Sequence, residues 1–491
     1  MTIPTHDPLR TRRYFLGRSG LSLGAIALQA LLGDRPATAG GPAASPVGSM
    51  APRPPHFPAR AQRVIYLFMA GGPSQLDLFD YKPVLQARAG EPIPESFIKG
   101  KPFAQITEKQ PKLLGTPYRF RRHGESGIEV SELLPRTAAM VDDLAVIKTV
   151  KTTEFVHHLA ELMMCTGTPR FGRPGLGAWV TYGLGSEAAD LPGFVVLPGV
   201  GALGGMARTK EAIYTNGFLP SAYQGTPLRP VGEPILNVNN PAGVTRAEQQ
   251  RLVRLIQELD EERLAGTGDP EIAARVSSYE LAFRMQAGTP ELLDLRGESR
   301  ATLALYGADP DQPSFARNCL LARRLVERGV RFVQVILGDW DHHGRIYQDL
   351  PSLCRQSDQA CAALIADLKA RGLLESTLVI WGGEFGRSNV VQLQPTGPIG
   401  RDHHIDAFTV WMAGGGVRAG QTVGETDEIG FNPIDKGIHV HDLQATILAL
   451  LGMDHRKLTY HYQGRDFRLT DVGGNVVDAL TPRSPWPGEA R

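Results

Sequence analysis

The sequence predicts an α/β protein built on a mostly parallel central sheet with helices on both faces. Two observations support this prediction: short apolar runs rich in β-branched and aromatic residues, and amphipathic helical patterns between them. Strands that alternate with helices form parallel sheets, because a crossover must carry the chain back before the next parallel strand begins. Such a sheet places its site beyond the carboxyl ends of its strands.

Six apolar runs are expected to be strands: Val64–Ala70, Leu144–Thr149, Phe194–Leu197, Arg331–Leu337, Thr377–Gly382 and Ala407–Ala413. Three helical patterns accompany them, at Phe315–Arg328, Leu350–Arg371 and His441–Leu451. The segment from about 200 to 310 differs, because a Gly/Pro-rich stretch leads into an amphipathic helix at Thr245–Leu264. We interpret this segment as a helical insertion that covers part of the site.

The N-terminus has the pattern of an export signal. Arg12 and Arg13 precede an apolar run at Leu21–Leu32, and the small residues Ala37–Ala39 provide a cleavage site. The paired arginines predict the twin-arginine route, so residues 1–39 are expected to be a signal peptide. The mature protein is then expected in the periplasm or cell envelope. A membrane anchor is the alternative, but the apolar run is short for a span.

The rest of the chain is divided by composition. Residues 40–60, rich in Pro, Ala and Gly, are expected to be a linker, 61–475 the main domain and 476–491 a tail. The formal net charge is +1, from 52 Lys+Arg against 51 Asp+Glu, which gives no electrostatic case for nucleic acid. No segment after the signal is apolar enough for a stable transmembrane helix. The four cysteines are expected to be buried thiols.

Side chains that bind metals follow the expected strands. Asp341 and His343 come after Arg331–Leu337, and Glu384 comes after Thr377–Gly382. Carboxylates and imidazoles are ligands that divalent metals share. We therefore expect a site for zinc, calcium or manganese, drawn from Asp341, His343, Glu384, His404, His403, Asp77 and Ser74. The alternative is a set of hydrogen-bonded loops without an ion.

Two histidines and two arginines are candidates for catalysis. His157 and His158 begin a short helix, HHLAELMMCTG, and a helix N-terminus favours an anion. Arg387 and Arg401 carry planar guanidinium groups that match phosphate or sulfate. The alternatives are a helix cap for the histidines and structural ion pairs for the arginines. Serine-hydrolase and nucleotide-binding motifs are absent from the sequence.

Several segments resemble the alkaline phosphatase and sulfatase superfamily. TLVIWGGEFGR resembles its TLVIFTSDHGE segment, with Glu384 in place of a metal-binding Asp, and HVHDLQATILALLGMD is similar to its late VxxVDLxPTLLxLLG helix. HHLAELMMCTG resembles its nucleophile helix, which puts His157 at the nucleophile position. The ordered motifs GGPSQLDLFD, HHLA, WDHH, GGEFGR, GRDHH and AGGGV identify the chain as a member of the sulfatase-like DUF1501 family over residues 60–475.

The resemblance implies an alkaline-phosphatase-like three-layer sandwich that hydrolyses sulfate or phosphate esters at a metal site. Its partner would be a sulfated or phosphorylated small molecule or polysaccharide. The sulfatase motif Cys-x-Pro-x-Arg is absent here, so the nucleophile is either His157 or water. The alternative function is a metal-stabilised, non-catalytic envelope binding protein on the same fold.

Overall fold

Among the residues that the structure describes, the central sheet has nine strands in the order β12-β4-β11-β8-β1-β7-β5-β6, with β13 beside β4. The computed structural model describes residues 50–482, apart from gaps at 102, 200–206, 231–234, 236–242, 268–271, 273–278, 280, 286–290 and 394–396. The expected signal peptide lies outside the described residues. The sheet strands are β1 (Arg63–Met69), β4 (Leu144–Lys151), β5 (Phe194–Leu197), β6 (Thr226–Pro227), β7 (Phe332–Leu337), β8 (Thr377–Gly382), β11 (Phe408–Ala413), β12 (Gln421–Val423) and β13 (Ile438–His439).

The sheet is mostly parallel, as the sequence predicted. Strand β1 runs parallel to β7 and β8, and β5 runs parallel to β7. The exception is β11, which is antiparallel to both β4 and β8. After β8 the chain forms a hairpin of β9 (Gly386–Gln392) and β10 (Gly400–His404) before β11. The chain therefore enters β11 from the carboxyl edge of β8 and must run in the opposite direction.

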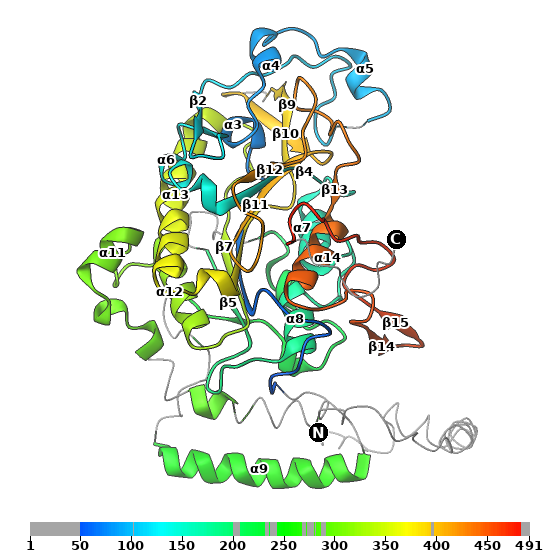
Figure 1. The fold of residues 1–491 in the computed structure, drawn as a ribbon. Coiled ribbons are helices and arrows are strands. Elements are labelled where there is room, and N and C mark those ends of the chain that lie inside the picture. The colour runs from blue at the N-terminus through cyan, green and yellow to red at the C-terminus, as the bar shows by residue number, and fades with distance from the viewer. Residues whose placement is uncertain are drawn as a thin grey trace, which may run out of the picture. The chain divides into compact units, whose positions relative to one another are not determined.

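Helices cover both faces of the sheet (Figure 1). On one face, α12 (Phe315–Glu327) and α13 (Ile346–Ala370) pack against inward side chains such as Ile65 and Leu67 of β1. On the other face, α7 (His157–Thr166), α8 (Leu176–Leu184) and α14 (Val440–Leu450) pack against Val64 and Tyr66. Alternate residues of each strand are thus buried on opposite sides, which explains the continuous apolar runs. The predicted three-layer architecture is confirmed.

The segment expected to be a helical insertion also contributes to the sheet and the site. Its described elements are η3 (Lys210–Tyr214), η4 (Ser221–Tyr223), β6, α9 (Arg246–Thr267), η5 (Leu295–Gly297) and α11 (Arg300–Tyr306). Strand β6 forms the edge of the sheet beside β5. On α9, Leu252, Leu255 and Leu259 are exposed. The amphipathic pattern was correct in predicting the helix, but its apolar side is not buried by the described residues.

The packed domain extends beyond both boundaries predicted from composition. In the expected linker, the Arg53 amide donates to the Leu184 carbonyl at 2.9 Å and the Arg60 amide to the Leu450 carbonyl at 2.8 Å. In the expected tail, Leu480 is fully buried. Proline and alanine are compatible with a packed extended chain, so composition alone does not distinguish it from a linker. The four cysteines are free and buried, as predicted.

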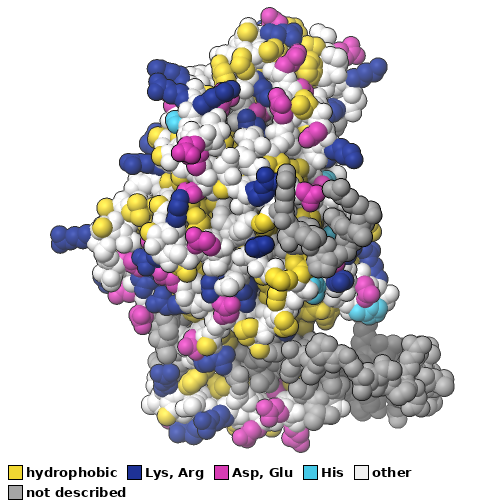
Figure 2. Space-filling model, in the orientation of Figure 1, with side chains coloured by type: hydrophobic (Ala, Val, Ile, Leu, Met, Phe, Trp, Pro, Cys, Tyr) yellow, Lys and Arg dark blue, Asp and Glu magenta, His cyan; other side chains and the backbone are white. Residues whose placement is uncertain are grey.

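Smaller elements complete the described fold. They are α3 (Gln75–Leu78), α4 (Pro83–Ala87), α5 (Glu95–Ile98), β2 (Phe120–His123), β3 (Ile128–Ser131), α6 (Pro135–Ala138), η2 (Val141–Asp143), η6 (Leu374–Ser376), β14 (Tyr460–Tyr462) and β15 (Arg465–Phe467). Among the described helices, none combines the length and apolarity needed to cross a membrane. Basic and acidic side chains are interspersed on the face drawn in Figure 2, in keeping with the nearly balanced charge.

Candidate metal centre

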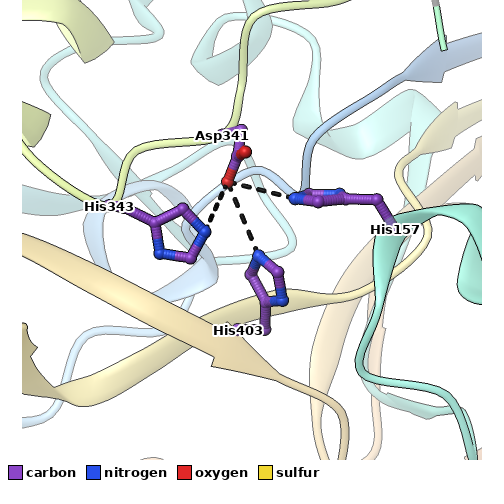
Figure 3. Close-up of side chains that lie close together, drawn as sticks. All are labelled: His157, Asp341, His343 and His403. Atoms are coloured by element: carbon purple, nitrogen blue, oxygen red, sulfur yellow. Dashed lines mark ion pairs between the residues drawn. The ribbon is translucent and has the colours of Figure 1, made fainter. Parts of the chain in front are cut away.

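Three histidines and one aspartate from separate segments converge beyond the carboxyl edge of the sheet (Figure 3). His157 begins α7 after β4, Asp341 and His343 lie in the loop after β7, and His403 lies in β10. Their Nε2 atoms surround one oxygen, Asp341 Oδ1, at 3.1 Å for His157, 3.0 Å for His343 and 3.5 Å for His403. The four side chains therefore form one cluster.

The second ring nitrogen of each histidine faces an oxygen acceptor. The Nδ1 distances are 2.7 Å from His157 to Glu384 Oε1, 2.6 Å from His343 to Gln392 Oε1, and 2.6 Å from His403 to the Phe155 carbonyl. Because these oxygens can only accept, each Nδ1 carries a hydrogen, and in a neutral ring Nε2 then presents its lone pair to the cluster. Metal-ligating histidines are held in this way by a second partner.

The carboxylates of the cluster require positive charge beside them. Burial lowers the pKa of His157, but Asp341 and Glu384 outweigh burial and raise it to about 9. Burial lowers the pKa of His403 to about 4, so that ring is neutral near pH 7. Burial also raises the pKa of Asp341, yet the histidines and Arg387 together hold it well below its usual range. A metal cation in the cluster would supply the positive charge that a second proton on His157 would otherwise bring to these carboxylates.

The residues present fit a divalent metal. The Nε2 atoms of His157 and His403 are buried; they lie 3.1 Å and 3.5 Å from Asp341 Oδ1, but neither has the geometry of a hydrogen bond to any group in the part of the chain that the structure describes. Such orphaned nitrogens are costly unless a cation or water fills the space between them. One ligand atom from each of the four residues lies within 4.8 Å of the others. Three imidazole nitrogens and a carboxylate oxygen suit zinc, manganese or iron.

Two buried glutamates, Glu384 and Glu161, each place a carboxylate oxygen within 4.8 Å of a His157 ring nitrogen. Glu384 accepts the Gly71 amide hydrogen, with N–O distances of 3.0 Å and 3.2 Å. Glu161 accepts the amides of Arg208 and Thr209 at 2.8 Å each. Burial and the neighbouring Glu384 raise the pKa of Glu161 to about 7. Glu161 therefore ties the start of the insertion to α7.

Arg208 is brought to the cluster by this attachment. Its Nη2 donates to Asp341 Oδ2 at 3.2 Å, and 53% of its side chain remains exposed.

Neither Glu161 nor Arg208 was predicted as a site residue. The spacing from His157 to Glu161 was an available signal, because residues four apart share one helix face. No local pattern distinguishes Arg208, which reaches the site only through tertiary contacts.

Gly71 lies where β1 meets the cluster and has a backbone that favours glycine, with φ of +113°. A Cβ atom here would lie 2.6 Å from the Asp341 nitrogen. We expect Gly71→Ala to lower the free energy of unfolding by about 3 kcal/mol or more, through strain and displacement of the Asp341 loop. Urea denaturation at fixed metal concentration measures this loss.

Gly90→Ala is the matched control for that substitution. Gly90 also has a positive φ, +89°, but nothing lies within 4 Å of its Cβ position. Its replacement is expected to cost about 1–2 kcal/mol from backbone strain alone. Equal losses for the two variants would contradict the close approach at Gly71.

Arg387 supports the cluster from the protein interior. It is fully buried, and its Nη2 donates to Asp341 Oδ1 at 2.7 Å. Its Nε donates to the Gly72 carbonyl at 3.0 Å and its Nη1 to the Arg401 carbonyl at 3.3 Å. These internal contacts correct the expectation that Arg387 clamps a substrate anion. The guanidinium instead holds Asp341 in place.

Arg401, Asp77 and Ser74 form a separate buried network. Arg401 Nε donates to Asp77 Oδ2 at 2.8 Å, and both side chains are fully buried. Ser74 Oγ donates to the same oxygen at 2.5 Å. Arg401 also donates to three backbone carbonyls, those of Leu114, Ser388 and Gly115. The structure thus places the expected anion clamp and two expected metal ligands in a structural ion-pair network outside the histidine cluster.

The neighbouring histidines are not members of the cluster. His404 is buried, and its Nε2 lies 2.7 Å from the Phe431 carbonyl oxygen, so His403 occupies the place expected for His404. His158 is exposed, one residue along α7 from His157. His342 is buried, and neither ring nitrogen makes a hydrogen bond within the described ranges. Each histidine pair therefore contributes one member to the cluster.

Fold and site together define an α/β protein with a candidate divalent-metal centre beyond the carboxyl edge of its sheet. Residues 61–481 match the family described as "Protein of unknown function (DUF1501)". The chain belongs to this family, as its ordered motifs predicted. No curated protein is matched by this chain.

Several solved structures are similar to the chain at low identity. One is the lipoteichoic acid synthase LtaP from Listeria monocytogenes, 9% identical with a TM-score of 0.33, covering 82% of this chain and 76% of that one. Another is the PsFucS1 sulfatase from Pseudoalteromonas sp., 12% identical with a TM-score of 0.34, covering 80% and 68%. A third is a protein in the alkaline phosphatase superfamily from Vibrio parahaemolyticus, 11% identical with a TM-score of 0.31, covering 82% and 69%.

Proposed function

We propose that the protein is an exported, metal-dependent hydrolase of sulfate or phosphate esters. The observation that carries this proposal is the convergence of three imidazole Nε2 atoms on Asp341 Oδ1, each ring being fixed through its Nδ1 atom. The order of the sequence motifs, which resembles that of the sulfatase superfamily, supports the type of ester. The twin-arginine pattern at the N-terminus supports export to the periplasm.

The donor set favours zinc or manganese over calcium. Calcium takes six to eight oxygen ligands, whereas this cluster offers three nitrogens and one carboxylate oxygen. The imidazole contacts with Glu384 and Gln392 orient two of the rings from outside the cluster. Of the residues expected to bind metal, Asp341, His343 and His403 are retained in the proposal, and His157 joins them as a ligand.

His157 is a ligand in this proposal and not the nucleophile. Its Nδ1 is bonded to Glu384, and its Nε2 lone pair points into the cluster beside Asp341, where a metal ion held by the four residues would take it up. A divalent ion held by the four residues would polarise an ester oxygen and lower the pKa of a coordinated water. Water is then the attacking group, and no covalent intermediate on the chain is expected.

Arg208 takes the role proposed for the anion-binding cation. Unlike Arg387 and Arg401, it is more than half exposed while touching Asp341. A guanidinium at the rim of the cluster can contact a sulfate or phosphate oxygen and stabilise the negative charge of the transition state. The proposed partner is a sulfated or phosphorylated small molecule or polysaccharide.

A non-catalytic, metal-stabilised envelope binding protein is the second candidate. The observation in its favour is that Arg387 and Arg401 are both fully buried and bonded to the protein's own oxygens. This candidate predicts metal without turnover. Metal analysis of the mature protein, together with hydrolysis assays on an aryl phosphate and an aryl sulfate, separates the two functions.

Replacing His157 with Ala is expected to abolish both metal binding and hydrolysis, because the substitution removes one ring of the cluster. His158→Ala is the matched control, since His158 is adjacent but exposed and should leave metal content unchanged. Loss of a ligand should weaken metal affinity by more than the roughly 10- to 100-fold that is typical when a group that only orients a ligand is removed. A His157 variant that keeps its metal but loses turnover would instead assign His157 as the nucleophile.

A further inference from the structure

A cationic cavity lies at the opposite end of α7 from the metal centre. Its volume is about 340 Å³, and it is bounded by the α7–α8 connection, Phe218 and the β14–β15 hairpin. One aspartate, Asp471, lines it together with four arginines: Arg170, Arg173, Arg465 and Arg468. Helix α7 has ten residues and rises about 1.5 Å per residue, so about 15 Å separates its two ends. The cavity is therefore a separate site.

The arginines outnumber the anions available to them. Arg465 Nη2 donates to Asp471 Oδ1 at 2.5 Å, and Arg468 donates to the Asp471 backbone oxygen. Within the described residues, no carboxylate forms an ion pair with Arg170 or Arg173. Burial, then the like charges of Arg465 and Arg170, lower the pKa of Arg173. A concave surface with this excess of positive charge attracts an anion.

Aromatic rings lie beside these guanidinium groups. The Arg173 guanidinium is 4.1 Å from the Phe467 ring centroid, and that of Arg465 is 4.4 Å from the same ring. Phe218 and Phe467 line the cavity, and Phe218 stacks on Tyr462, which lies outside it, at 5.1 Å. Aromatic faces pack against the C–H face of a sugar ring, while guanidinium groups bind sulfate through paired hydrogen bonds.

We propose that this cavity binds a sulfated sugar unit. The cavity is large enough for one such unit, and the arginines and aromatic rings match its sulfate group and its ring. Single-stranded nucleic acid also stacks on aromatic rings, but it requires a basic groove along its backbone, and this chain has a net charge of only +1. The sugar sulfate as ligand class rests on the function proposed above, whereas the anion site does not.

Equilibrium binding of a sulfated galactan tetrasaccharide to the mature protein tests the proposal without requiring turnover. Arg170→Gln with Arg173→Gln is expected to weaken binding at least about 10-fold, because two charge-assisted contacts are lost. Arg170→Gln alone, at an exposed position, should weaken it by a smaller factor and guards against a folding defect. Metal content and thermal midpoint should match those of the unmodified protein.

Arg251→Gln with Arg254→Gln removes the same charge from the exposed surface of α9 and is the control. Its affinity should stay within twofold of the unmodified protein. Equal binding of the desulfated tetrasaccharide, equal affinity of the Arg170/Arg173 variant, or tighter binding of a short oligothymidine strand would each overturn the proposal. If the tetrasaccharide binds through these arginines but no ester is hydrolysed, the cavity proposal stands and the proposed enzymatic function fails.

Discussion

Asp341→Asn is expected to remove bound metal and with it all measurable ester hydrolysis. Asp341 Oδ1 is the oxygen on which His157, His343 and His403 converge, and the substitution keeps its shape while removing its charge. The loss of affinity should exceed the roughly 100-fold found for groups that only orient ligands. Metal analysis after dialysis against a weak chelator measures it.

Asp339→Asn is the matched control, the same substitution two residues earlier in the same loop. Asp339 has a positive φ of 71°, a conformation that asparagine adopts readily. Stability gives a second readout, because a ligand present at about 1,000 times its Kd stabilises the folded state by about 4 kcal/mol. A strong chelator should lower the thermal midpoint of the Asp339 variant and leave the Asp341 variant unchanged. Retention of metal by Asp341→Asn would contradict the proposed centre.

Arg401→Met is expected to destabilise the fold by about 3–5 kcal/mol, the cost of leaving a buried charge without its partner. Arg401 and Asp77 are both fully buried, and the guanidinium also satisfies three backbone carbonyls. A clamp for substrate would behave differently, raising KM with little change in stability. Urea denaturation, analysed as the free energy of unfolding, separates the two roles.

A double-mutant cycle with Asp77→Leu isolates the ion pair. The double variant should be less destabilised than the sum of the single variants, with a coupling energy of about 1–3 kcal/mol. Full recovery is not expected, because the carbonyls of Leu114, Ser388 and Gly115 lose their donor in both backgrounds. Two results would argue against a structural pair: destabilisations of the single variants that simply add in the double variant, or a free energy of unfolding of the Arg401 variant within about 1 kcal/mol of that of the unmodified protein.

The architecture was readable from the sequence because each central strand is buried on both faces. The continuous apolar runs predicted the bounds of β5 and β8 as they are observed. The other four expected strands differ from the observed strands by one or two residues at their ends. The direction of β11 was not readable. It depends on the β9–β10 hairpin, whose strands are rich in polar residues and glycine and resemble a loop in sequence.

The convergence of these side chains was predictable by region but not by residue. Successive side chains of a strand point to opposite sides, so the choice between His403 and His404 depends on the register of β10. That register shifts between Arg401 and His403, and no feature of the sequence reveals the irregularity. The arginines were misjudged for a different reason: a buried guanidinium bonded to carbonyls has the same local sequence as one facing a substrate.

The cluster proposed to bind metal joins parts of the chain that are far apart along it. His403 contacts the Phe155 carbonyl across 248 positions, and His157 contacts Glu384 across 227. Closing such long loops costs entropy before any ligand atom is in place, and proteins dominated by distant contacts fold slowly. An ion that binds only the completed cluster cannot nucleate folding, because its ligands come together only after these loops have closed. If the cluster binds such an ion, its kinetic effect would fall on unfolding, where it would lengthen the lifetime of the folded state.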